Sequence, residues 1–324
     1  CIRDRSPMDD TPAYKAGVLA GDFITFVDDK PMLGLTLSEA VEIMRGPVGS
    51  SIKLTIVREG LEDPIEVEVT RDVIKLTAAK VRIDNDVVIM RVTTFNEQTI
   101  PNLEDGMKAT MEKTGTNEPK GFILDLRNNP GGLLSVAISV TDLFLDQGEI
   151  VSTRDREGKG ERYKASKGDI AKGKPVVILI NAGSASASEI VAGALQDHQR
   201  AIVLGTKSFG KGSVQSVLPM GQSGGIRLTT ARYYTPSGRS IQALGVTPDV
   251  FLEFKRVEEK EEEKRKTFSE ADLEGALSND SLTDSEKEML RKEELSFQET
   301  KKRRDKDNQL AHAIDLIEGL SVLS

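Results

Sequence analysis

Two short segments of the sequence place a serine and a lysine where they could carry out nucleophilic chemistry. Ser186 lies in the segment 181–189, which joins an apolar run to a run of helical periodicity. A hydroxyl group at a strand–helix junction lies beside the free backbone N–H groups of a helix N-terminus, and these can stabilise an oxyanion. A small-residue turn with a capping serine is the simpler interpretation of such a segment, so the catalytic interpretation requires a base.

Lysine is a better candidate for that base than histidine. His198 lies far along the helix predicted after Ser186, and His312 lies in a charged C-terminal segment, so a Ser-His-Asp triad is not expected. A lysine can take the place of histidine if burial lowers its pKa from about 10.4 toward neutrality. Lys211 fits this role, because glycines on both sides allow a close approach and the neighbouring Phe209 could help to exclude water.

The lysine segment also matches a phosphate-binding pattern. Residues 205–211 read G-x-x-x-x-G-K, the pattern of a P-loop that would bind nucleotide phosphates. That motif requires a serine or threonine after the lysine and then a helix, whereas Gly212 comes next and residues 214–218 alternate as a strand does. We therefore interpret the match as accidental.

The strands and helices expected around the serine and lysine segments indicate a layered α/β domain. Apolar runs expected to be strands alternate with runs of helical periodicity, and Ser188 or a neighbour is available to cap the helix after the serine segment. The predicted strands are 87–92, 122–126, 176–180, 202–204, 214–218 and 226–234, and the predicted helices are 103–113, 136–145 and 188–195.

The layered core is expected over residues 77–253, between two other parts. The first part, residues 1–76, predicts a small module with a helical turn and strand over 13–29, a helix over 37–45 and strands over 52–58 and 65–70. The last part, residues 254–324, opens with a charged run at 257–266 that is interpreted as a solvated helix or linker.

One helical face in the last part is apolar. Leu310, Ile314, Ile317 and Leu320 recur at helical spacing, so this face could dock on the body of the protein or pair with another subunit.

The composition of the chain argues against several classes of function and site. The formal net charge of −8 over 324 residues argues against a nucleic-acid-binding surface. The one cysteine, Cys1, excludes an internal disulfide and a thiolate metal cluster. No apolar run approaches the roughly 20 residues that span a bilayer, and the first residues lack a signal pattern, so any export signal is expected upstream.

Taken together, the two segments resemble the carboxyl-terminal processing, or tail-specific, protease family. Residues 183–189 read G-S-A-S-A-S-E, and residues 208–215 read S-F-G-K-G-S-V-Q. In that family the middle serine of the first motif is the nucleophile and the lysine 25 positions later is the base, as Ser186 and Lys211 are placed. The resemblance implies a serine endopeptidase that forms an acyl-enzyme without a metal or organic cofactor, on a core like that of crotonase-like and Clp-type enzymes.

Three further site residues are implied by the resemblance alone. Gln215 is expected to orient the lysine, and the N–H groups of Ala187 and of Gly132, in the turn 125–132, are expected to form the oxyanion hole. Contact between Gln215 and Lys211 requires a helical turn over 211–215, because a strand would place their Cα atoms about 13 Å apart. The predicted strand would then begin later than residue 214.

The first part of the chain resembles a PDZ domain at residues 6–7, 13–22 and 24–28. Such domains bind an extended C-terminal peptide as an added strand and capture its carboxylate on backbone N–H groups. The family's first strand and carboxylate loop have no counterpart in residues 1–76, so a truncated PDZ module is expected, and tail capture by this chain stays open.

The resemblance also implies partners and a location. Substrates are expected to be proteins or peptides with accessible C-termini; an adaptor protein and a second copy bound through the C-terminal helix are further candidate partners. The implied location is the cell envelope, the bacterial periplasm in the first place or a plastid lumen, with membrane association through a segment absent from this chain. A catalytically silent peptide-binding scaffold is the alternative, which the intact Ser186, Lys211 and Gln215 disfavour.

Overall fold

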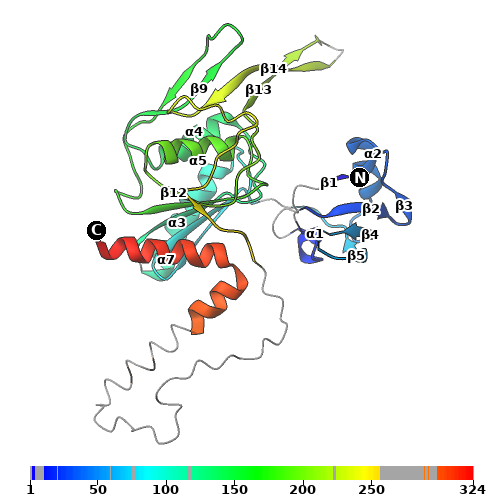
Figure 1. Ribbon diagram of the computed structural model, residues 1–324, viewed down its shortest axis with the longest axis horizontal. Helices are drawn as coiled ribbons and strands as arrows, with labels where there is room; N and C mark the ends of the chain where they lie inside the picture. Colours follow the sequence, from blue (N-terminus) through cyan, green and yellow to red (C-terminus); the bar gives the residue numbers. More distant parts are fainter. Residues whose placement is uncertain are drawn as a thin grey trace, which may run out of the picture.

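The computed structural model contains three β-sheets with helices around them (Figure 1). It describes residues 2–3, 11–19, 21–58, 60–74, 77–115, 118–221, 224–255, 288, 291 and 298–323. Cys1 and the charged run 257–266 lie outside the described residues. Among the helices described there, none combines the length and apolar character required to cross a bilayer.

The first module is a five-stranded antiparallel sheet with two helices and a core of its own. Strands β1, β2, β4 and β5 lie in that order, β3 pairs with β2, and the predicted helices and strands of this module are confirmed to within two residues at each end. The bounds are β1 (Ile2–Arg3), α1 (Pro12–Lys15), β2 (Phe23–Val27), β3 (Lys30–Pro31), α2 (Leu37–Met44), β4 (Ser51–Val57) and β5 (Ile65–Thr70).

A six-stranded sheet forms the centre of the larger body. Its order is β15-β12-β11-β8-β7-β6, and all neighbours are parallel except β6 and β7. The bounds are β6 (Ala79–Asp84), β7 (Val87–Val92), β8 (Gly121–Asp125), β11 (Val176–Ile180), β12 (Ile202–Gly205) and β15 (Val250–Phe251). Parallel strands direct their carboxyl ends to one edge, so the turns after β8 and β11 meet there.

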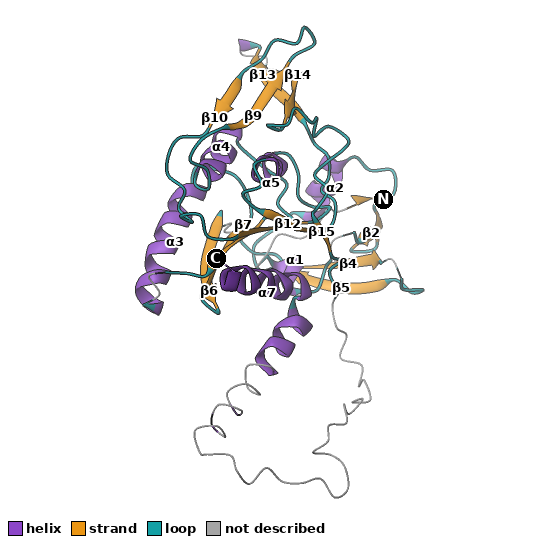
Figure 2. Ribbon diagram, turned by 60° about the vertical axis from the view of Figure 1, so that its left-hand side comes forward, coloured by secondary structure: helices purple, strands orange, loops and turns teal. Residues whose placement is uncertain are grey.

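Both faces of this sheet are covered by helices, which explains the continuous apolar runs in its strands. One face packs against α3 (Thr99–Thr114), α4 (Leu134–Asp142) and α5 (Ala187–Asp197). The other face packs against α7 (Asn308–Leu323) (Figure 2). Along β11, for example, Ile178 faces the first helical layer and Val177 and Leu179 face α7. The predicted mixed α/β architecture is therefore confirmed.

Helix α7 docks on the body of its own chain. Leu310, Ile314 and Ile317 are buried against the sheet, and Leu320 is half-buried. The sequence left two alternatives for this apolar face, docking on the body or pairing with another subunit. In the structure the face docks on the body, where the sheet covers it.

A four-stranded antiparallel sheet lies at the other end of the body, in the order β10-β9-β14-β13. Its bounds are β9 (Glu149–Arg154), β10 (Arg162–Lys164), β13 (Ser213–Pro219) and β14 (Gly225–Tyr234). The sequence predicted β13 and β14 but not β9 and β10. Strand β10 has three residues, and the apolar residues of β9 are limited to Ile150 and Val151. A β-bulge between Val214 and Gln215 interrupts the pairing of β13 with β14.

Candidate active site

Ser186 lies between strand β11 and helix α5, at the carboxyl edge of the six-stranded sheet. It is the N-cap residue of α5, with φ 57° and ψ −111°. A positive φ in a residue other than glycine costs about 1–3 kcal/mol and persists only where the surroundings hold it. The sequence predicted the helix from Ser188, but Ser188 lies inside the helix and its hydroxyl donates to the Asn129 carbonyl oxygen.

The buried carboxylate of Glu189 joins the serine segment to the lysine segment. Its Oε2 accepts the Ser186 N–H at 2.7 Å and the Lys211 N–H at 2.8 Å. Its Oε1 accepts the Gly210 N–H and the Ser208 hydroxyl, both at 2.6 Å. Glu189 is completely buried, and these four donors replace the water that an ionised carboxylate would otherwise bind. Two segments 25 positions apart are thus fixed by one side chain.

The turn after β8, residues 125–132, packs directly against the serine segment. The Asn129 carbonyl oxygen accepts the Ala185 N–H at 3.0 Å. A Cβ placed on Gly131 would lie 2.9 Å from Ser186 Cβ and 3.0 Å from Ala187 N, so a side chain at this position would fill the space beside the serine. We call residues 125–132 the oxyanion turn, after the role that the family resemblance predicts for Gly132.

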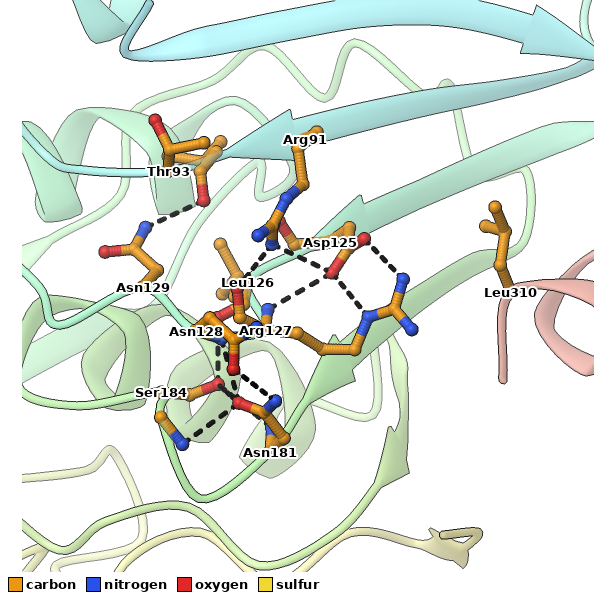
Figure 3. Close-up of polar contacts among 12 residues, drawn as sticks. Arg91, Thr93, Asp125, Leu126, Arg127, Asn128, Asn129, Asn181, Ser184 and Leu310 are labelled. Carbon is orange, nitrogen blue, oxygen red and sulfur yellow. Dashed lines mark hydrogen bonds and ion pairs between the residues drawn. The ribbon is translucent and has the colours of Figure 1, made fainter. Parts of the chain in front are cut away.

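A pair of asparagines also joins the oxyanion turn to the serine segment (Figure 3). Asn181 Nδ2 donates to Asn128 Oδ1 at 2.6 Å, and Asn181 Oδ1 accepts the Asn128 N–H at 2.8 Å. Asn128 has φ 58°, a left-handed conformation that asparagine tolerates better than most residues. This double contact fixes the distance between the two turns.

Two backbone N–H groups near Ser186 are not used by the fold. The Gly131 N–H donates to Asn129 Oδ1 at 2.9 Å. Within the described residues, no hydrogen bond is found for the N–H of Gly132 or of Ala187. Gly132 forms a parallel bridge with Phe95. The two hydrogen bonds of this bridge use the Gly131 carbonyl oxygen and the Leu133 N–H, so the Gly132 N–H takes no part in it. These are the two amides predicted for the oxyanion hole.

Lys211 is half-buried in a loop without regular structure between β12 and β13. The Gly212 N–H donates to Gln242 Oε1 at 3.1 Å, and the Gly210 carbonyl accepts the Ala243 N–H at 2.9 Å, so the loop is bound on both sides of the lysine. In the described chain no hydrogen bond joins the Ser186 hydroxyl to Lys211 Nζ. Phe209, expected to help exclude water, is 47% exposed.

The helical turn expected over residues 211–215 is not formed. Strand β13 begins at Ser213, and Gln215 is exposed and paired in register with Thr229 of β14. Pairing with a long neighbouring strand satisfies the backbone of this segment, and the extended chain separates Gln215 from Lys211. Among the described residues no hydrogen bond connects these two side chains. The same strand leaves residues 205–211 without the helix that a P-loop needs.

The two histidines have other partners. His198, at the C-terminal end of α5, has Nε2 2.7 Å from the Glu149 carbonyl oxygen. His312 is exposed on α7, with Nδ1 2.9 Å from the Asn308 carbonyl oxygen. Over the described ranges, no group of three or more His, Cys, Asp or Glu side chains is placed to hold a metal ion.

Comparison with known proteins assigns the family. Residues 86–252 match peptidase family S41, and residues 3–58 match the PDZ domain family. A "Carboxy-terminal-processing protease" of Bartonella bacilliformis is 53% identical over 277 residues, which are 85% of this chain and 64% of that protein. The chain belongs to peptidase family S41. This assignment confirms the family resemblance that residues 183–189 and 208–215 indicated.

Other relatives agree with the assignment to family S41. A "Carboxyl-terminal-processing protease" of Synechocystis is 39% identical over 76% of this chain and 58% of its own length. The solved structure of a "photosystem II D1 C-terminal processing protease" superimposes with a TM-score of 0.66 at 31% identity, over 76% of this chain and 67% of that chain. This S41 chain therefore spans less than two thirds of the length of the curated relatives named here.

Sequence reasoning about this S41 chain missed the residues that hold its site together. Glu189, Asn181 and Asn129 were not singled out, although each makes at least two of the contacts described above. A signal existed for Glu189: Ser186 and Glu189 have the S-x-x-E spacing of a capping box, in which the glutamate returns to the N-cap amide. No comparable local signal marks the contacts of Glu189 with residues 208–211.

Proposed function

We propose that this chain is the peptidase part of a serine endopeptidase that cleaves protein substrates near or from their C-terminal tails. The observation that carries the proposal is the position of Ser186, strained at the N-terminus of α5 and tied to the Lys211 loop by Glu189. The oxyanion turn packs against it at Gly131, and the amides of Gly132 and Ala187 have no hydrogen bond among the described residues. The two relatives described above, which are named carboxy-terminal-processing and carboxyl-terminal-processing proteases, support the class of substrate.

The proposed reaction is acyl transfer in two stages. The neutral amine of Lys211 accepts the proton of the Ser186 hydroxyl as Oγ attacks the substrate carbonyl carbon. The negative oxygen of the tetrahedral intermediate binds the Gly132 and Ala187 amides. The C–N bond then breaks, and the leaving amine takes the proton from Lys211. Water attacks the acyl-enzyme with Lys211 again as base, the bond between the acyl carbon and Ser186 Oγ breaks, and Lys211 returns the proton to Oγ. Each step needs only groups of this chain, the substrate and water.

Gln215 can take part in the proposed reaction only after residues 211–215 rearrange. It would orient the lysine if residues 211–215 exchanged the start of β13 for a helical turn, and the bulge at Val214 and Gln215 is the weak point at which the pairing with β14 can open. We therefore propose that the present arrangement is a resting one and that substrate binding selects the other.

We further propose the division of labour expected from the family. Residues 1–76 act as a PDZ module that selects or admits substrate, residues 77–253 carry out the chemistry, and residues 254–324 support the body. The proposed location is the cell envelope, and an adaptor protein is a candidate partner. The bacterial origin of the two relatives named above is compatible with this location.

Incubation with β-casein, an unstructured protein, tests the function. The chain should convert casein to fragments over hours, with peptide ends that mass spectrometry locates inside the casein sequence. Fluorophosphonate labelling of the same samples should add one probe to Ser186. Absence of both cleavage and labelling, in this chain and in a chain extended at its N-terminus, would favour the silent peptide-binding scaffold.

Glu189→Gln should lower casein cleavage about a hundredfold, because a misplaced lysine loop misaligns the base. The glutamine amide would also point N–H donors at backbone N–H groups, which should reduce the free energy of unfolding by about 1–3 kcal/mol. Steady-state cleavage and urea unfolding measure the two effects. Glu157→Gln, in an exposed pair with Lys159, is the matched control and should change neither. Full activity of Glu189→Gln would show that the carboxylate does not align the site.

A further inference from the structure

We propose that Asp307, at the start of the docked C-terminal helix, is a positioning residue for the oxyanion turn and acts through Arg127. The inference rests on the proposed function, since it assigns a role within the same site. It adds to that site a residue from a segment that no motif of the sequence connects with the chemistry.

Arg127 is held between two carboxylates. Its Nη1 and Nη2 donate to Asp307 Oδ1 and Oδ2 at 2.9 and 2.8 Å, the two-pronged geometry that arginine forms best with a carboxylate. Its Nε and Nη2 also donate to Asp125 at 2.9 and 2.7 Å. The Arg127 side chain is 12% exposed and Asp307 22%, so solvent screens this contact less than an ordinary surface ion pair.

Asp307 adds a second carboxylate to a cluster that contains Arg91, Arg127 and Asp125. Arg91 Nη1 lies 3.2 Å from Asp125 Oδ1 and also donates to the Arg127 carbonyl oxygen (Figure 3). Burial opposes ionisation of Asp125, but the charges of Arg127 and Arg91 outweigh it and hold the pKa of Asp125 well below its ordinary value. Without the charge of Asp307, the largely buried Arg127 would lose one of its two carboxylate partners, which is unfavourable.

Arg127 lies inside the oxyanion turn, so its position decides where the glycines lie. It is followed by Asn128, whose left-handed backbone is held by Asn181, and by Asn129, which binds the Gly131 amide. A shift of the Arg127 backbone therefore moves the amide of Gly132. Because donors must lie close to the developing oxyanion to stabilise it, a shift of about 1 Å is enough to slow the reaction.

Asp307 allows a substitution that separates this role from support of the helix. Its Oδ1 accepts the Leu310 N–H at 3.0 Å and so caps α7. Asparagine caps a helix about as well as aspartate, so Asp307→Asn keeps the cap and the shape of the side chain but removes the charge that binds Arg127.

The same segment offers a matched control. Arg303 pairs with Asp84, at the end of β6, at 3.1 Å, which is a docking contact of the C-terminal segment away from the oxyanion turn. Asp84→Asn removes one carboxylate charge from a docking contact of the C-terminal segment, as Asp307→Asn does, but leaves Arg127 untouched. If weaker docking of the C-terminal segment lowers activity, both variants should be less active. If the position of Arg127 sets the activity, only Asp307→Asn should be less active.

The experiment compares the unmutated chain with Asp307→Asn and Asp84→Asn. We expect Asp307→Asn to lower kcat for a casein-derived peptide about tenfold with KM changed less than about twofold, and Asp84→Asn to preserve both constants. Hydrogen–deuterium exchange should increase in peptides from residues 126–135 in Asp307→Asn only.

Unchanged exchange in Asp307→Asn, or an equal loss of kcat in both variants, would overturn the inference. Absence of cleavage by the unmutated chain would instead count against the proposed function, and the exchange measurement would still decide the role of Asp307. The two failures are therefore distinguishable.

Discussion

Ser186→Ala should abolish cleavage, with kcat/KM at least about ten-thousandfold below that of the unmutated chain. The hydroxyl supplies the atom that forms the acyl-enzyme, and the oxyanion amides alone retain only a small part of the acceleration. Cleavage of a fluorogenic peptide measures this loss. The strained backbone is held by the Glu189 contact to the Ser186 N–H, which alanine keeps, so the variant should unfold at the same urea concentration.

Ser139→Ala is the control for this experiment. Ser139 lies on the exposed side of α4, where its hydroxyl donates to the Ser135 carbonyl oxygen. Activity of this variant should equal that of the unmutated chain. If Ser186→Ala cleaves at more than a few per cent of the original rate, the nucleophile lies elsewhere.

Lys211→Met should lower kcat/KM about a thousandfold or more, because no other group near Ser186 is proposed to accept its proton. Lys211→Arg tests whether a proton acceptor or only a positive charge is needed, since arginine keeps the charge but stays protonated. We expect both variants to be inactive in the same fluorogenic assay and folded by circular dichroism.

Lys207→Met removes an exposed lysine from the same loop and should have no effect. Activity of Lys211→Arg close to that of the unmutated chain would show that the lysine acts by its charge. Activity of Lys211→Met at that level would remove Lys211 from the site altogether.

The sequence predicted most of the body because its signals are local. The strand β11 is a short apolar run buried on both faces, and the junction after it carries the small residues that a tight turn requires. The strands β6 and β15 were missed, since each lies at an edge of the sheet and lacks a continuous apolar run. Edge strands are defined by their neighbours, which a local pattern does not contain.

At the site, sequence and resemblance could name the groups but not their arrangement. Of the two amides named for the oxyanion hole, that of Gly132 has no hydrogen bond among the described residues because the bridge at Phe95 bypasses it, and this bridge is a long-range contact. Gln215 was placed on a helical turn, whereas pairing with β14 makes it part of a strand. The contact of Arg127 with Asp307 spans 180 positions, and no periodicity links residues so far apart.

The order of the elements along the chain has a consequence for biosynthesis. The helix that covers the second face of the six-stranded sheet, α7, begins at Asn308, whereas the last strand of that sheet ends at Phe251. While the ribosome adds the residues in between, the apolar side chains of that face have no cover, and a nascent chain in this state is prone to aggregate. Asp307 is synthesised after all the strands of that sheet, so a nascent chain that ends before it lacks the charge that we propose to set the oxyanion turn. The proposed activity would then be complete only after α7 has been synthesised.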